Sequence, residues 1–447
     1  MELDMTQNIQ IKYLETQQVI EGFGCFGGRE IPFFRDARRD DIMKALFQDL
    51  QFSIVRTEVH PNFSTQPGER NFNMDANLDI PPNDPYFDNP DQAEVERRSQ
   101  LWILKTVKQQ YPHIKIVPSV WSPPYYMKTA LKKLSKDYYA EFANFLADYI
   151  EAYQTAGIPI FAMSPQNEPE NIISPWDVCL WLPSDTASFV EKYMKPIFQQ
   201  RNLDTKIMVG ESANWGFNSI TLNLVSWFMK DKKNVDILAS HAYSIPSLKG
   251  TVSYDTNPLG QLPSGYQSAW ITESCATTPF DPSMTLGLQA AICLHKFLAV
   301  KEVNAFIFWL GMIRGNNNEA LISSNGVGNY QLTKVYDVMG NYSRYVKEGY
   351  RRITTNSAAL ASSLYVSAFK ATDTDNLSIV IINASDDQVS ASIHLEQAPL
   401  SIQTLTPYTT PTELGVRWQA GEAIHLVDGK FNTHLLPSSV TTFTSSS

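Results

Sequence analysis

Two glutamates stand directly after apolar runs, where a strand would end and a side chain could reach a ligand. Glu168 lies in the stretch Gln166-Asn167-Glu168-Pro169, and Glu273 follows the run SAWIT. Retaining glycoside hydrolysis needs two carboxyl groups about 5–5.5 Å apart, because one protonates the leaving oxygen while the other attacks the anomeric carbon. We predict that Glu168 is the general acid/base and that Glu273 is the nucleophile.

The two glutamates must differ in protonation although they share one side-chain type. A negative charge on Glu273 favours a protonated Glu168 before attack, and loss of that charge in the glycosyl-enzyme lets Glu168 ionise and act as base. Asn167 is placed to hydrogen-bond a sugar 2-hydroxyl. Flat faces for sugar rings come from three aromatic residues that also follow apolar runs: Trp121, Tyr243 and Trp309.

The elements that must position these residues form an alternating pattern of strands and helices. Short β-branched runs are separated by longer stretches with helical spacing, which indicates parallel strands with crossover helices. The clearest helices are 137–157, which ends at Gly157, and 285–300. Eight strands complete a closed (β/α)8 TIM barrel. We expect them at 19–24, 52–59, 114–120, 160–166, 207–212, 236–243, 268–274 and 303–309.

The pattern changes after about residue 345, where short Val/Ile/Thr/Ser-rich runs with polar breaks begin. Such runs are typical of an antiparallel β-sandwich. We expect residues 9–17 to pair into the same sheets and 440–444 to form the closing strand. The α/β chain is therefore predicted to hold a catalytic barrel at 18–344 and a β-sandwich side domain at 1–17 and 345–447.

Composition limits the partners and cofactors. The net charge of −10, without a Lys/Arg stripe, argues against nucleic acid. Four cysteines form no CxxC pair, and the seven histidines form no HExxH motif, so we expect no metal and no cofactor. A disulfide has no support in the spacing. The expected partner is a polysaccharide or oligosaccharide substrate, and we expect a monomer.

The sequence shows no membrane anchor, because no apolar run approaches the ~18 residues that a membrane span needs. The start MELDMTQNIQ has neither the basic end nor the apolar stretch of a signal peptide. We expect a secreted protein whose signal peptide is absent from this sequence; a cytoplasmic protein is the alternative.

An ordered set of motifs resembles glycoside hydrolase family 30, whose members are retaining barrel hydrolases. The motifs run nearly end to end: QVIEGFG, FSIVRTEV, SVWSPPYYMK, SPQNEPE, VDILASHAY, AWITES and FIFW, then NYSRYVKEGYRRI at the barrel exit and SSVTTF near the end. By this resemblance, Glu168 takes the acid/base place and Glu273 the nucleophile place. Arg56 matches an arginine that supports the nucleophile's charge. The −1 subsite would be lined by Asn167, Trp121, His241, Tyr243 and Trp309.

Substrate choice follows from the branch of the family. FSIVRTEV, VDILASHAY, the exit segment and LYVSAFK are most similar to xylanases, which implies β-1,4-xylan or glucuronoxylan, cut in endo or exo fashion. Arg314 lies roughly where glucuronoxylan-specific members hold the glucuronate branch, although its neighbours depart from that pattern. A β-1,6-glucanase and a glucosylceramidase-like β-glucosidase are the alternatives. The insertion 62–91 is expected to wall one end of the cleft.

Every candidate also has a structural interpretation. Strand-end glutamates can form structural ion pairs, and an arginine such as Arg56 often only neutralises them. His241 can be a core histidine, the tryptophans can be packing residues, and Arg314 can be a solvated loop charge. An inactive barrel that binds carbohydrate is the non-enzyme alternative. The presence of both glutamates beside Asn167 argues against it.

Overall fold

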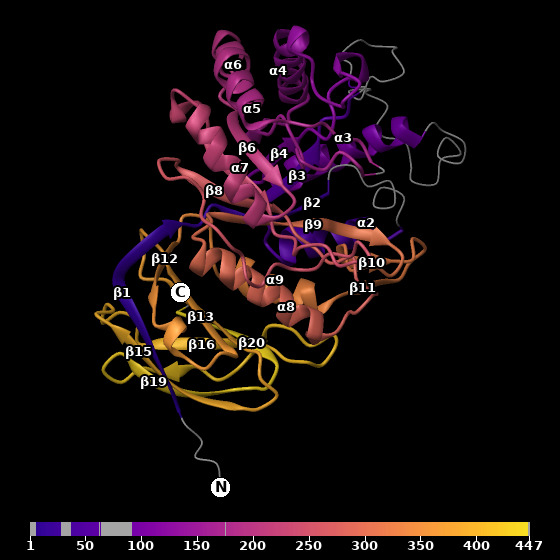
Figure 1. The fold of residues 1–447 in the computed structure, drawn as a ribbon. Helices are drawn as coiled ribbons and strands as arrows, with labels where there is room; N and C mark the ends of the chain where they lie inside the picture. Colours follow the sequence, from indigo (N-terminus) through magenta and orange to yellow (C-terminus); the bar gives the residue numbers. More distant parts are fainter. Residues whose placement is uncertain (1–5, 28–36, 62, 64–91, 175, 446–447) are drawn as a thin grey trace.

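A ring of parallel strands forms the upper part of the molecule in the computed structural model, which describes residues 6–27, 37–61, 63, 92–174 and 176–445 (Figure 1). The strands pair in the order β4-β3-β2-β9-β8-β7-β6-β5, and parallel bridges Ile116–Ile160 and Ser119–Ser164 join the two ends. The predicted barrel is confirmed. Its strands are β2 (Gly22–Phe26), β3 (Ile54–Glu58), β4 (Lys115–Ser119), β5 (Ala162–Met163), β6 (Lys206–Ser212), β7 (Ile237–His241), β8 (Ser268–Glu273) and β9 (Ala305–Arg314).

Buried side chains from seven of these strands fill the barrel interior, among them Met208 and Trp270. Strand β2 contributes glycine there instead. A Cβ on Gly24 would lie 2.0 Å from the Ile54 carbonyl oxygen, so only glycine lets β2 approach β3 this closely. Strands β10 (Ala320–Ser324) and β11 (Tyr330–Leu332) extend the sheet beyond β9.

Strand β5 (Ala162–Met163), the fourth strand of the barrel, is shorter than the predicted 160–166. Beyond Met163 the chain pairs only at Ser164, whose hydroxyl donates to the Gln166 carbonyl oxygen at 2.9 Å. The backbone then turns through Glu168, which has a φ of 41°. The strand therefore ends early because its last residues form the turn that presents Glu168.

Both predicted helices are present. Residues 137–157 contain α4 (Tyr139–Thr155), followed by Gly157 with a φ of 82°, the left-handed conformation expected after a helix end. Residues 285–300 lie within α8 (Met284–His295) and the wider helical turn that follows it at Lys296–Val300. The other helices are α2 (Arg39–Lys44), α3 (Gln92–Gln110), α5 (Pro183–Phe189), α6 (Lys195–Gln200), α7 (Trp215–Phe228) and α9 (Lys334–Ser343).

The lower part of the molecule is a second sheet with the strand order β17-β16-β20-β14-β13-β12-β1-β15-β19. As predicted, an N-terminal strand joins it, and 440–444 lies in its strand β20. One pair, β1 with β15, is parallel rather than antiparallel, because β1 lies between two strands that run in opposite directions. The strands are β1 (Gln7–Val19), β12 (Arg351–Thr355), β13 (Leu364–Lys370), β14 (Leu377–Asn383), β15 (Val389–Glu396), β16 (Thr404–Thr410), β17 (Gln419–Ala420), β18 (Ile424–His425), β19 (Lys430–Leu435) and β20 (Ser439–Thr444).

Helices α8 and α9 lie between the barrel and this sheet and pack against β13, β14, β16 and β20 (Figure 1). Asp337 of α9 is buried there, 3.2 Å from Lys334 Nζ and 2.5 Å from Arg417 Nε. The Trp418 indole N–H donates to the Asp337 carbonyl oxygen at 2.7 Å. These contacts connect α9 with the segment that precedes β17 of the second sheet. The proposed domain limits, 18–344 against 1–17 with 345–447, stay a prediction.

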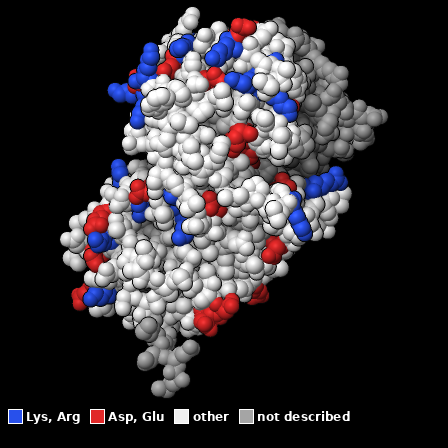
Figure 2. Space-filling model, viewed as in Figure 1, with Lys and Arg blue, Asp and Glu red and all other residues white. Residues whose placement is uncertain are grey.

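The charge pattern of the surface, the length of the helices and the state of the cysteines can be compared with the sequence predictions. On the face that Figure 2 shows, basic and acidic side chains are interspersed, without a continuous basic stripe. None of the helices within the described ranges is long and apolar enough to cross a membrane. The four cysteines are free thiols, all buried. The insertion 62–91, apart from Phe63, lies outside the described residues.

The ion pairs of Asp337 give a prediction for stability. Asp337→Ala would leave buried Lys334 without its counter-ion, which is expected to lower the free energy of unfolding by about 3–5 kcal/mol. Urea unfolding followed by circular dichroism measures the change, with Asp373→Ala as an exposed control. A loss below about 1 kcal/mol, the range of surface ion pairs, would contradict the role given to Asp337.

Candidate active site

The carboxyl ends of the barrel strands bring most of the predicted site residues together. Arg56 lies in β3, Glu168 follows β5, His241 ends β7, and Glu273 ends β8. Arg56 and His241 are completely buried, whereas Glu168 and Glu273 keep 7% and 6% of their surface exposed. The two carboxyl groups are therefore the groups of this set that retain some access to solvent.

Glu273 is fixed by two hydrogen bonds. Arg56 Nη1 donates to one carboxylate oxygen at 2.6 Å, and the Tyr243 hydroxyl donates to the other at 2.5 Å. The second Arg56 nitrogen, Nη2, donates to Asn167 Oδ1 at 2.7 Å. One buried guanidinium thus orients both Glu273 and the amide beside Glu168.

Glu168 is held by its backbone and by one side chain. Its N–H donates to the Glu211 carbonyl oxygen at 2.9 Å, and its Oε2 accepts from Asn171 Nδ2 at 2.9 Å. One oxygen of Glu168, one oxygen of Glu273 and one nitrogen of His241 all lie within 4.8 Å of one another. The two carboxyl groups therefore face each other across a short gap.

His241 lies among three carboxyl groups. Its Nδ1 is 3.4 Å from Glu168 Oε1, and its Nε2 is 3.3 Å from Glu211 Oε2 and 3.7 Å from Glu273 Oε2. Neither ring nitrogen has a hydrogen bond of good geometry. Burial lowers the pKa of His241, but the nearby Glu273, Glu168 and Glu211 raise it more, to about 10. Charge rather than directional bonding therefore holds the imidazolium.

Glu211, at the end of β6, is a residue that the sequence reasoning missed. Its carboxylate accepts from the Ser119 hydroxyl at 2.7 Å and from the Thr272 hydroxyl. Burial alone would raise its pKa, but Arg56 and then His241 lower it to about 2. A signal was present, because Glu211 is the last but one residue of a predicted barrel strand, and working residues usually come from the ends of such strands.

The pKa directions of the two facing glutamates differ from the sequence expectation. Burial raises the pKa of Glu168, but contacts with His241 and then Asn171 outweigh it, so the pKa falls. For Glu273, burial raises the pKa by more than His241 and Arg56 lower it. The imidazolium of His241 thus lowers the pKa of Glu168, whereas the sequence predicts that Glu273 raises it.

Aromatic rings stand beside the carboxyl groups. The Arg56 guanidinium lies 4.8 Å from the Trp121 ring centroid, and the Trp121 and Trp309 centroids are 6.0 Å apart. Phe26 of β2 packs against both rings. Trp309 is half-buried, whereas Trp121 is only 7% exposed. Each tryptophan thus packs within the barrel mouth, and Trp309 also offers exposed ring surface.

Arg314 does not join this cluster. It ends β9 as an exposed residue, and its guanidinium lies against the backbone of Gly326: a Cβ there would be 2.8 Å from Arg314 Nε. Among the described residues, no hydrogen bond or ion pair joins Arg314 to the buried carboxyl groups of the cluster. The role of Arg314 in holding a glucuronate branch stays a prediction.

Glu168, His241 and Glu273 are close enough together to ligate a metal ion. However, Arg56 Nη1 already places a permanent positive charge 2.6 Å from Glu273. A divalent cation would have to displace or repel that guanidinium, which remains charged at any ordinary pH. This donor set therefore fits ion pairing better than metal ligation.

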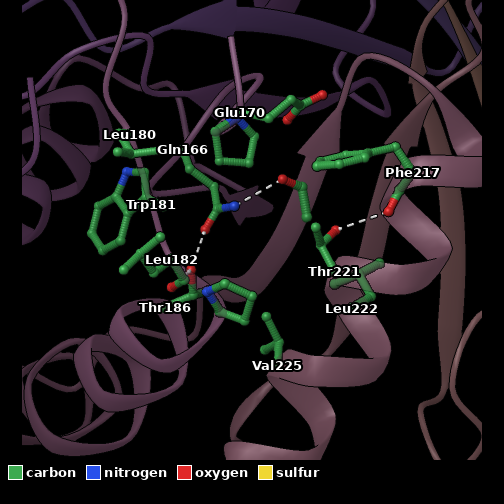
Figure 3. Close-up of a pocket in the computed structure, with 13 residues that line it drawn as sticks. Gln166, Glu170, Leu180, Trp181, Leu182, Thr186, Phe217, Thr221, Leu222 and Val225 are labelled. Atoms are coloured by element: carbon green, nitrogen blue, oxygen red, sulfur yellow. Dashed lines mark hydrogen bonds between the residues drawn. The ribbon is translucent and has the colours of Figure 1, made fainter. Parts of the chain in front are cut away.

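A separate cavity of about 150 Å³ lies between α5 and α7, behind the turn that carries Glu168 (Figure 3). Its wall includes Gln166 and Pro169 but neither Glu168 nor Glu273. The Gln166 amide donates to the Gly210 carbonyl oxygen at 2.8 Å and accepts from the Thr186 hydroxyl at 3.3 Å. The cavity therefore borders the support of the turn and not the facing carboxyl groups.

A barrel with two facing carboxyl groups at its strand ends, flanked by tryptophans, has the arrangement that barrel glycoside hydrolases use.

No family model matches the chain. Glucuronoxylanase XynC of Bacillus subtilis is 25% identical over 376 residues, and the match covers 79% of each chain. An endo-1,6-β-D-glucanase of Neurospora crassa is 24% identical over 262 residues, and the match covers 55% of this chain and 53% of the relative.

Among solved structures, the catalytic domain of family 30 xylanase C from Talaromyces cellulolyticus superposes with a TM-score of 0.78. Its sequence identity is 19%, and the match covers 98% of this chain and 100% of that chain. These likenesses confirm the resemblance to glycoside hydrolase family 30, with xylanases among its most similar members. Similarity to these relatives supports an enzyme of the glycoside hydrolase type, and activity assays test it against the inactive-barrel alternative.

The surroundings of His241 predict its titration. With a pKa of about 10, the imidazole should stay protonated up to about pH 9 and lose its proton only above that. Histidine-selective ¹⁵N NMR measures this directly, and the exposed His425 serves as an internal reference signal. If His241 were neutral at pH 7, the charge-balanced arrangement described above would be wrong.

Proposed function

We propose that this protein is a retaining β-glycoside hydrolase that cleaves β-1,4-xylan or glucuronoxylan by double displacement. The observation that carries the retaining mechanism is the spacing of Glu168 and Glu273, whose nearest oxygens lie within 4.8 Å. Retaining enzymes hold their carboxyl groups about 5–5.5 Å apart, whereas inverting enzymes leave about 6.5–9.5 Å for a water molecule. The short gap favours direct attack by a carboxylate.

In the first displacement, a Glu273 oxygen bonds to the anomeric carbon as the glycosidic C–O bond breaks. The leaving oxygen takes its proton from Glu168. Arg56 and Tyr243 keep the Glu273 carboxylate oriented before attack. Asn167, held by Arg56, can contact the sugar 2-hydroxyl, and Trp121 and Trp309 can bind the ring faces.

The proton for this step is supplied within the cluster. Protonated His241 lies 3.4 Å from Glu168, so the pair His241⁺/Glu168⁻ carries the same proton as neutral His241 beside a Glu168 acid. Coupled groups of this kind titrate as a unit. Transfer of the proton to Glu168 prepares the general acid when the leaving oxygen arrives.

In the second displacement, Glu168 accepts a proton from a water molecule, whose oxygen bonds to the anomeric carbon. The bond to Glu273 breaks, and the sugar leaves with its original configuration. The negative charge then returns to Glu273 beside Arg56. The chain's own ionisable groups perform both steps.

The xylan assignment follows from the similarity to xylanases, XynC in particular. The Neurospora relative supports a β-1,6-glucanase as the second candidate. Product analysis separates them. The purified protein is incubated with glucuronoxylan, unsubstituted xylooligosaccharides, β-1,6-glucan and glucosylceramide. Xylooligosaccharide products would support the proposal, and their lengths would distinguish endo from exo action. Products only from β-1,6-glucan or the glycolipid would keep the mechanism and replace the substrate.

Removing the nucleophile should abolish turnover. Glu273→Ala is expected to lower kcat on an aryl β-xyloside by at least about 1000-fold, because no group remains to form the glycosyl-enzyme. Initial rates measure the loss, circular dichroism checks the fold, and Glu422→Ala in the side domain is the control. A variant with wild-type rates would refute the assignment.

Removing the acid/base should produce a substrate-dependent loss. Glu168→Ala is expected to slow natural substrates most and activated aryl glycosides least, since a good leaving group needs little protonation. Added azide should partly restore the rate and give a glycosyl azide of retained configuration. A defect of equal size on both substrates, without azide rescue, would mean that Glu168 has another role.

A further inference from the structure

A third buried carboxylate remains without a role in the proposed reaction. Glu211 has no exposed surface, and its side chain contacts groups from four other strands of the barrel. Burying a carboxylate costs several kcal/mol unless charges and hydrogen bonds compensate. Glu211 is compensated by Arg56 and His241, the two cations that also contact Glu273 and Glu168.

The side chain of Glu211 lies behind both cations of the site. Its Oε2 is 3.5 Å from Arg56 Nη2 and 3.3 Å from His241 Nε2. Each cation contacts a catalytic glutamate through a different nitrogen. Arg56 Nη1 lies 2.6 Å from Glu273 Oε2, and His241 Nδ1 lies 3.4 Å from Glu168 Oε1. Glu211 is thus linked to each catalytic glutamate through one cation.

The backbone of Glu211 has a second contact with the acid/base. Its carbonyl oxygen accepts the N–H of Glu168 at 2.9 Å. Both residues have positive φ, 61° for Glu211 and 41° for Glu168, a conformation that is strained for a residue with a side chain. Such strain persists only where surrounding contacts enforce it, as the hydroxyls of Ser119 and Thr272 do for Glu211.

The balance of charges explains why a carboxylate is needed there. The groups facing His241 are Glu168 and Glu170 from the turn after β5, Glu211 of β6, Glu273 of β8, Arg56 of β3 and Tyr243 after β7. With Glu211 neutral, the carboxylates within 4 Å of the Arg56 and His241 cations would be the two glutamates that react, Glu168 and Glu273. Their charge changes during the cycle, so His241 would lose a constant counter-ion.

We propose that Glu211 is a positioning residue of this active site: its permanent negative charge keeps His241 protonated beside Glu168 and keeps Arg56 directed at Glu273. Glu211 touches neither substrate nor the reacting atoms and acts through these two cations. The inference rests on the proposed function for its kinetic consequence, but not for its electrostatic part.

Glu211→Gln tests the charge with little change of shape, since the amide oxygen can still accept from a hydroxyl. We expect the midpoint of His241, followed by ¹⁵N NMR, to fall by at least about one pH unit, the shift that loss of a close counter-ion produces. The alkaline limb of kcat/KM should move down with it, and kcat should fall while KM changes little.

Asp337→Asn is the matched control, because it neutralises another buried, ion-paired carboxylate far along the chain from the site. It should lower stability without moving the midpoint of His241 or the pH profile. If Glu211→Gln behaves in the same way, Glu211 is a structural residue and the proposal is wrong. Should Glu211→Gln fail to fold, Glu211→Asp, which keeps the charge, must keep His241 protonated at pH 8; a neutral His241 there also overturns the proposal.

The two readouts separate this inference from the function. A lowered His241 midpoint in a protein that hydrolyses none of the glycans would support the role of Glu211 and refute the proposed reaction. Normal glycan hydrolysis with an unmoved His241 midpoint in Glu211→Gln would leave the reaction in place and refute the positioning role.

Discussion

The site depends on one constraint: five ionisable groups are buried together and must balance their charges. Three carboxyl groups, Glu168, Glu211 and Glu273, surround the guanidinium of Arg56 and the imidazole of His241. An unpaired buried charge would be far more costly than any single packing defect. The positions of all five side chains are therefore coupled, and the protonation of one sets the protonation of the others.

The barrel satisfies this constraint because its parallel strands end at one rim. Four strands, β3, β6, β7 and β8, and the turn after β5 supply the five groups, so the backbone of the ring positions each side chain. Closure of the ring needs tight approach between strands, as at Gly24 of β2. Outside the ring, α8, α9 and the buried Asp337 connect the barrel with the second sheet. The ring thus fixes the backbone positions from which the charged side chains project.

The low pKa of Glu168 in the free protein is informative about the chemistry of the cluster. A general acid needs a proton at the moment of bond breaking, and it does not need to hold that proton while the site is empty. His241, with its pKa of about 10, holds it instead. In the proposed arrangement, the fixed negative charge of Glu211 holds the proton on His241 while the site is empty, and transfer of that proton to Glu168 leaves the imidazole neutral.

Much of this protein was determined by its sequence alone. Regular alternation of β-branched and helical segments predicted eight strands and the second sheet, since period and length of apolar runs are local properties. Glu168, Glu273, Arg56 and His241 were identifiable because strand ends and motifs can be read in linear order. Tertiary structure alone decided which groups meet. It brought Glu211 to His241, left Arg314 outside the cluster and reversed the expected pKa directions, because electrostatic interactions depend on distances between strands that sequence order does not contain.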